Sequence, residues 1–259
     1  MTASGFSGSK SRRSRGQFAE ILKVQGKLAL REPYGILGGI AFPVILLVVF
    51  WFISSHVPGN VGNTGLTVLD LWIPTLMVIA FVTITISLPS TLVRDREIGW
   101  LRRVSTTPVH PWRLLAAQLV VNLLLAVVAI VVLFVGAGVF FGASLRLSVP
   151  FFVLATVLSM AEIFAFGLMV VAIVPSQTIA QPVAGVLFFL LLFLSGLWVN
   201  PAQVGEPLRS VMYYSPTGAA AKALLAAVFS SSPPYAAWVT MAAYAAIFGF
   251  IAIRFFRWE

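Results

Sequence analysis

The sequence predicts an all-α membrane protein that crosses the bilayer six times. Of its 259 residues, 59% are hydrophobic and only 10% are charged, and the mean hydropathy is +0.99. A soluble domain is about half apolar and roughly a quarter charged, so this chain has too few polar side chains to cover a water-soluble globule. Its apolar runs are long and continuous, which favours helices over the short alternating strands of a membrane barrel.

Six apolar runs have about the length that a helix needs to cross the hydrocarbon core, which is ~20 residues. They are residues 36–54, 71–93, 114–141, 149–174, 179–199 and 235–256. Prolines such as Pro43 and Pro89 interrupt some runs, but neighbouring helices can satisfy the carbonyl groups that a proline leaves free. The runs and their short connections predict one transmembrane domain over residues 34–259.

Two different segments precede the first run. Residues 1–16 are rich in Ser, Gly and Arg and have almost nothing to bury, so we expect a disordered basic N-terminus. Over residues 17–33, apolar side chains recur on one helical face while Lys23 and Lys27 lie on another, which is typical of an amphipathic helix in the membrane interface. A plain extension of the first span is the alternative, and Pro33 favours a break because the residue before a proline avoids helical geometry.

The distribution of positive charge predicts the orientation. Fourteen of the 17 Lys and Arg residues fall before the first run, between the second and third, or in the last turn of the sixth and after it. The positive-inside rule then places both termini in the cytoplasm, in a multi-pass protein of the cell inner or plasma membrane. Positive charge beside span ends fits contact with lipid headgroups better than a nucleic-acid partner. With no Cys and only two His residues in separate segments, we expect no metal site.

The loop after the second run combines charge with apolar residues. It begins with charged residues at 94–97, continues through Ile98 and Leu101, and ends at Thr107 and Pro108. An exposed apolar strip flanked by charge often marks a contact surface. A solvated loop with a structural turn is the alternative, and the pattern by itself does not separate the two.

A family resemblance rests on this loop. Its Glu-x-Gly-x-Leu-Arg-Arg-x-x-x-Thr-Pro pattern, from Glu97 to Pro108, resembles the cytoplasmic loop of type-2 ATP-binding-cassette (ABC) exporter permeases, of the daunorubicin-resistance-like drug-efflux branch. The Leu-Ser-Gly-Leu-Trp-Val stretch at 194–199 and the Tyr-Ser-Pro-Thr stretch at 214–217 are similar to that family's fifth span end and external segment. The resemblance implies a cytoplasmic coupling helix, an external re-entrant hairpin before the last span, and a connecting helix at 17–33.

The resemblance also implies a function. The chain would be the permease of an ATP-driven exporter for a hydrophobic drug, antibiotic or lipid-like compound. Its partners would be two copies of a cytosolic ABC ATPase and a second permease chain, as a homodimer or related heterodimer. The chain lacks the Gly-x-x-x-x-Gly-Lys-Ser/Thr stretch that cradles phosphates, so we expect no enzyme activity and no cofactor here, with Mg-ATP bound by the partner. The implied ATPase-coupling residues are Arg96, Glu97, Ile98, Gly99, Leu101, Arg102, Arg103, Thr107 and Pro108.

One acidic residue, Glu162, lies well inside a predicted span. An intramembrane carboxyl group is costly and therefore suggests a function, although a neutral carboxyl hydrogen-bonded to Ser159 or to a backbone carbonyl is an alternative. Candidate residues of a translocation path are Phe42, Phe81, Glu162, Phe188 and Phe193. Two other functions stay open: export of a polysaccharide or glycolipid, and an ATP-independent proton-coupled carrier that uses Glu162.

Overall fold

The computed structural model describes residues 22–27, 37–56, 67–99, 111–142, 147–229 and 232–255. Within these ranges every regular element is helical and no strand occurs. The expected disordered segment 1–16 lies outside them, as do most of the expected interfacial helix and the core of the expected coupling helix. Of the interfacial helix, residues 22–27 are described; they are helical, with Lys23 and Lys27 exposed.

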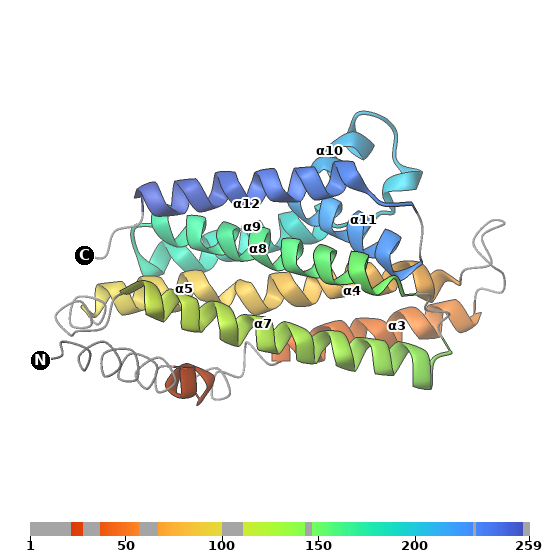
Figure 1. Cartoon of the computed structure of the whole chain (residues 1–259), viewed down its shortest axis with the longest axis horizontal. Coiled ribbons are helices and arrows are strands. Elements are labelled where there is room, and N and C mark those ends of the chain that lie inside the picture. Colours follow the sequence, from red (N-terminus) through yellow and green to blue (C-terminus); the bar gives the residue numbers. More distant parts are fainter. Residues whose placement is uncertain are drawn as a thin grey trace, which may run out of the picture.

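The helices form an elongated bundle (Figure 1). Their bounds are η1 (Leu37–Ala41), α3 (Phe42–His56), α4 (Val68–Thr85), α5 (Ser87–Glu97), α7 (Pro111–Val135), η3 (Gly136–Phe140), α8 (Val149–Ile173), α9 (Gln177–Leu194), η4 (Pro201–Gln203), α10 (Leu208–Tyr214), α11 (Pro216–Val228) and α12 (Tyr235–Phe255). The π-helical turns η1 and η3 continue directly into α3 and out of α7, respectively.

Five helical stretches of the described chain are long and apolar enough to cross a membrane. They are Leu37–His56, Leu115–Phe140, Val149–Ile173, Gln177–Leu194 and Tyr235–Phe255. Their outer faces carry large apolar side chains, including Leu124 of α7 and Phe250 of α12, at exposures that would be unfavourable in water. Four of these stretches agree with predicted spans to within two residues at each end, and Gln177–Leu194 corresponds to the predicted run 179–199.

Two predicted spans differ in detail from the structure. The predicted run 71–93 is divided at Ile86 into α4 and α5, because Pro89 has no N–H for the carbonyl four residues earlier and its ring crowds that carbonyl. The predicted run 179–199 ends at Leu194, since the backbone turns at Gly196, whose φ of 87° favours glycine.

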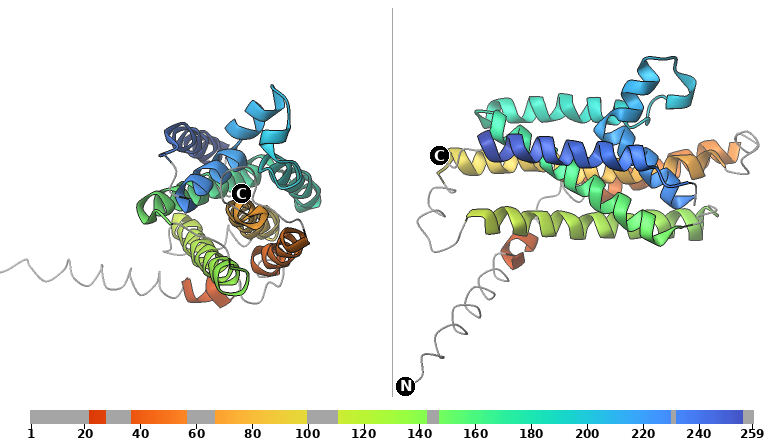
Figure 2. Two further views of the ribbon diagram at one scale, coloured as in Figure 1. Left: turned by 90° about the vertical axis from the view of Figure 1, so that its right-hand side faces the viewer. Right: turned by 45° about the horizontal axis from the view of Figure 1, so that its top comes forward.

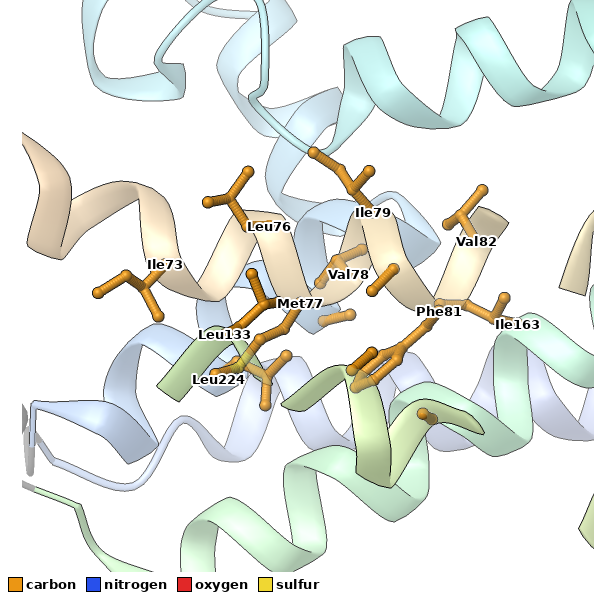
Figure 3. Packing of buried hydrophobic residues seen from close by; sticks show 14 of the residues in the cluster. Ile73, Leu76, Met77, Val78, Ile79, Phe81, Val82, Leu133, Ile163 and Leu224 are labelled. Carbon is orange, nitrogen blue, oxygen red and sulfur yellow. The ribbon is translucent and has the colours of Figure 1, made fainter. Parts of the chain in front are cut away.

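Helix α4 forms the centre of the bundle. Every residue from 73 to 85 is buried, and helices α3, α7, α8, α9 and α11 all pack against α4 (Figures 2 and 3). Phe81 lies at the centre of this packing, with Ile163 of α8 nearby (Figure 3). Close approach depends on small residues: a Cβ atom on Gly167 of α8 would lie 2.8 Å from Cγ2 of Thr85.

The bundle has two distinct ends. Helices α8 and α12 run in the same direction, because Phe151 pairs with Trp238 near their starts, at 5.5 Å between ring centroids, and Phe166 pairs with Phe248 further along, at 5.3 Å. Their starts lie near α10 and α11, at what we call the hairpin end, and their last turns lie with the end of α5 (Figure 1). The latter is the charged end, named for the four charged residues that close α5.

Candidate functional site at the charged end of the bundle

The last turn of α5 carries four consecutive charged residues, from Arg94 to Glu97. Arg94 and Asp95 form a loose ion pair, with 3.8 Å between Nε and Oδ1. Burial raises the pKa of the Asp95 carboxyl above its ordinary value, and the Arg94 guanidinium only partly opposes this effect. This pair therefore contributes little attraction that could fix the end of α5 in place.

Arg96 instead links α5 by hydrogen bonds to the turn between α8 and α9. Its Nη2 donates to the carbonyl oxygen of Val174 at 2.6 Å and to that of Pro175 at 3.0 Å. These carbonyls are available because α8 ends before Pro175, and Val174 has the extended ψ of 125° typical of a residue before proline. One guanidinium thus satisfies two carbonyl groups that no helix can use.

Glu97 fastens α5 to the start of α9. Its Oε1 accepts a hydrogen bond from the Gln177 N–H at 2.8 Å. The first N–H groups of a helix have no partner within the helix, and Ser176, the N-cap of α9, makes no side-chain cap bond. A carboxylate at this position also interacts favourably with the positive end of the helix dipole. We call the bonds of Arg96 and Glu97 to residues 174–177 the α5–α9 clamp.

An apolar cluster supports the clamp from the bundle side. It joins α5, α8 and the first turn of α9 through side chains that are at most 7% exposed. Its buried members are Leu88, Leu92, Val93, Phe164, Val170, Val171, Val174 and Ala180. Because such packing resists small displacements, a displacement of the end of α5 must carry the turn between α8 and α9 with it.

The structure describes four of the predicted coupling residues. Arg96 and Glu97, which we expected to face a partner or water, bind the turn between α8 and α9. Ile98 follows α5 and is 62% exposed, as a contact residue would be. Gly99 has a φ of 68° with open space around its Cβ position, so here glycine permits the left-handed turn that ends the helix. The predicted residues Leu101, Arg102, Arg103, Thr107 and Pro108 lie outside the described residues.

None of the predicted path residues lines either of two cavities that the described residues form, one between α4, α5, α8 and α9 and the other at the hairpin end. Phe81 is fully buried in the main core, and Phe42 and Phe188 are partly buried against the same core. Phe193 lies near the end of α9 and is partly exposed. Three of these aromatic rings therefore serve the packing of the bundle.

Glu162 is fully buried in α8. It shares a helical face, within about 60° of arc, with the two phenylalanines of α8 that contact α12. Among the described residues, neither its carboxyl oxygens nor Oγ of Ser159 has a hydrogen-bond partner, so the structure does not show the alternative of a carboxyl bonded to Ser159 or to a backbone carbonyl. The adjacent Ile163 lines a small apolar cavity of about 20 Å³ between α4, α5, α8 and α9, whereas Glu162 does not.

Sequence reasoning missed two features. The turn at Pro175 and Ser176 carries the other half of the clamp, and the signal for it was the proline between two long apolar runs. Lys222 lines a cavity of about 450 Å³ at the hairpin end, and the signal was a single charge in the otherwise apolar stretch 216–228. Within the described segments, no group of three or more acidic or histidine side chains could hold a metal ion.

Comparison with known families identifies the chain. Residues 16–229 match the ABC-2 type transporter family, a range that begins ahead of the helix at 22–27 and ends just after α11. No curated protein matches the sequence. The family match covers well over half of the chain and agrees with a bundle of membrane-length helices. The chain therefore belongs to the ABC-2 type transporter family and is a multi-pass membrane permease of an ABC transporter.

Proposed function

We propose that the chain is the permease subunit of an ATP-driven exporter that effluxes a hydrophobic drug, antibiotic or lipid-like compound. The supporting observation is the family match over residues 16–229, together with the loop pattern from Glu97 to Pro108, which resembles the daunorubicin-resistance-like branch. Two cytosolic ATPase subunits would supply the energy, and a second permease chain, identical or related, would complete the path.

The proposed orientation puts the charged end in the cytoplasm. We count six crossings, with α4 and α5 together making the second. The ends of α5 and α12 lie at the same end of the bundle (Figure 1), which agrees with the positive charge that follows both helices in the sequence. The hairpin of α10 and α11 would then face the outside.

The α5–α9 clamp suggests how force would enter the bundle. The ATPase would bind the segment that follows α5, with Ile98 among the contacts, and would push α5 when it binds ATP. Arg96 and Glu97 then act as positioning residues, because they join α5 to α9 through the bonds to residues 174–177. Movement of α9 would open or close the path.

Transport by a reconstituted complex tests the proposal. The chain would be purified with a candidate ABC ATPase from the same genome and placed in inside-out vesicles, and uptake of a fluorescent anthracycline would be followed. We expect uptake that needs ATP and fails when the P-loop lysine of the ATPase is replaced. Copurification should be lost with Leu101→Asp. Uptake by the permease without any ATPase would contradict the proposal and favour a proton-coupled carrier, which Glu162→Gln would then inactivate.

A further inference from the structure

A cavity of about 450 Å³ lies beneath the α10–α11 hairpin. Its walls come from the first turns of α4, the turn after α9, and helices α10 and α11. The volume is within the ~300–1,000 Å³ range of small-molecule sites. Under the proposed orientation, this cavity is at the outer surface of the membrane, where an exported molecule leaves.

Lys222 gives the cavity its charge. Among the described residues that line the cavity, it is the only charged one. Its side chain is exposed, and Nζ lies over the ring of Tyr213, 4.9 Å from the centroid. A cation held in this way, without a carboxylate among the lining residues, attracts an anionic group.

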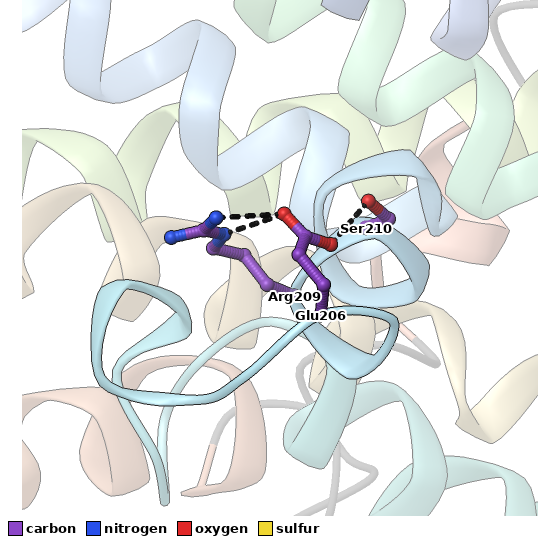
Figure 4. Close-up of polar contacts among 3 residues, drawn as sticks. All are labelled: Glu206, Arg209 and Ser210. Carbon is purple, nitrogen blue, oxygen red and sulfur yellow. Dashed lines mark hydrogen bonds and ion pairs between the residues drawn. The ribbon is translucent and has the colours of Figure 1, made fainter.

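The acidic residues of the hairpin end are already occupied. The Asp70 carboxylate is buried and accepts hydrogen bonds from the N–H and the hydroxyl of Thr67, both at 2.8 Å. Glu206 pairs with Arg209 at 2.7 Å and accepts a hydrogen bond from Ser210 (Figure 4). Neither carboxylate lines the cavity.

The remaining lining suits an apolar body. Trp72 lines the cavity and stacks on Phe50, with 4.2 Å between ring centroids, which holds the indole in place. Trp198 also lines it and is 62% exposed, so its ring is available to a ligand. Aromatic walls around one cation match an amphiphile with an acidic headgroup.

We propose that this cavity binds the carboxylate or phosphate headgroup of an anionic amphiphile, with Lys222 as its counter-ion. The shared chemistry has two sources: an exported solute on its way out, or an anionic lipid of the outer leaflet. The assignment of the cavity to the outer surface rests on the proposed function, whereas the binding itself does not.

Two matched probes test the binding on the purified permease alone, in nanodiscs of phosphatidylcholine. 1-Anilinonaphthalene-8-sulfonate carries a negative charge, and N-phenyl-1-naphthylamine is its uncharged analogue. We expect Lys222→Gln to weaken saturable binding of the sulfonate about fivefold, as for loss of one solvent-accessible ion pair, with the neutral probe unchanged. Lys222→Arg should restore the preference. Arg209→Gln, which removes a cation from the same hairpin but not from the cavity, should change neither probe.

The outcomes separate the two sources and the two proposals. Loss of sulfonate binding when phosphatidylglycerol is added identifies a lipid occupant. Persistent binding, with ATP-driven uptake of the sulfonate by the full complex, identifies an exported solute. Equal effects of Lys222→Gln on both probes, or none on either, overturn the anion site. If ATP-driven export is the same with and without Lys222→Gln, the proposed function stands without the anion site. If the sulfonate binds selectively but no ATPase supports transport, the anion site stands and the proposed function fails.

Discussion

Replacing Arg96 by glutamine should uncouple ATP hydrolysis from transport. The change removes two charge-assisted hydrogen bonds, at 2.6 and 3.0 Å, from the turn between α8 and α9. Hydrogen bonds to a charged group contribute about 1.5–3 kcal/mol each. The bond to Val174 is only part-buried and the bond to Pro175 is exposed, so water competes for both carbonyls and we expect a total loss of about 1–2 kcal/mol. That corresponds to roughly a 5–30-fold change in the equilibrium between conformations in which the turn moves with α5 and conformations in which it is detached from α5.

The assay compares three quantities in the same preparation: the amount of ATPase that copurifies, the rate of ATP hydrolysis, and solute uptake. We expect Arg96→Gln to leave copurification unchanged and to lower uptake per ATP several-fold. Arg94→Gln is the matched control, because it removes a cation from the same turn whose ion pair, within the described part of the chain, is with its neighbour Asp95. Loss of copurification in Arg96→Gln would place Arg96 at the ATPase interface, and equal coupling in both variants would refute the clamp.

Three further outcomes follow from the same structure. Gly167→Ala should destabilise the protein by about 1–3 kcal/mol, because the new Cβ would lie 2.8 Å from Thr85 Cγ2. Gly185→Ala is the control and should not destabilise the protein, because the space at its Cβ position is open. Thermal unfolding in detergent compares the two variants, and equal melting temperatures would argue against the close contact. Gly99→Ala should lower uptake per ATP, since an L residue at a φ of 68° costs about 1–2 kcal/mol, and Gly99→Asn should recover part of it. Hydrogen bonds from Ser210 and Arg209 lower the pKa of Glu206 below its ordinary value of 4.5. The stabilising effect of the Glu206 carboxylate is therefore complete above pH 4.5 and is lost as the pH falls through the lowered pKa. The difference in melting temperature between the protein and Glu206→Gln should shrink on acidification, and a constant difference would contradict this.

The apolar composition of the sequence was sufficient to predict most of the membrane-length helices. Five of six predicted spans correspond to single membrane-length helical stretches, because each run of ~20 apolar residues satisfies its own backbone hydrogen bonds only as a helix in lipid. Helices α10 and α11 occupy the segment for which an external re-entrant hairpin was predicted, and its re-entrant role stays a prediction. The break at Ile86 was not predicted, although Pro89 is its cause, since a proline in a membrane helix produces either a kink or a regular turn depending on its neighbours.

The candidate site divides differently. The charged pattern at 94–97 directed attention to the end of α5, but residue types alone did not show what Arg96 and Glu97 bind, and the coupling role of this segment stays a prediction. Their partners lie about 80 positions away, and these partners are backbone groups, which have no signature in the sequence. The glycines illustrate the same limit: a Cβ atom on Gly167 would crowd Thr85 and one on Gly185 would meet nothing within 4 Å, yet both residues lie inside apolar runs.

The amino-acid sequence alone determined that the chain is a membrane protein, how many apolar segments it has, and which loop carries the charge. Hydropathy and charge can be read from neighbouring residues along the chain, without knowledge of tertiary contacts. Only the tertiary structure decided that α4 lies at the centre, that α5 is fastened to the start of α9, and that Lys222 lines a cavity with aromatic walls. These features depend on which helix faces lie against one another, and helices of nearly uniform hydrophobicity do not encode that choice in any local pattern.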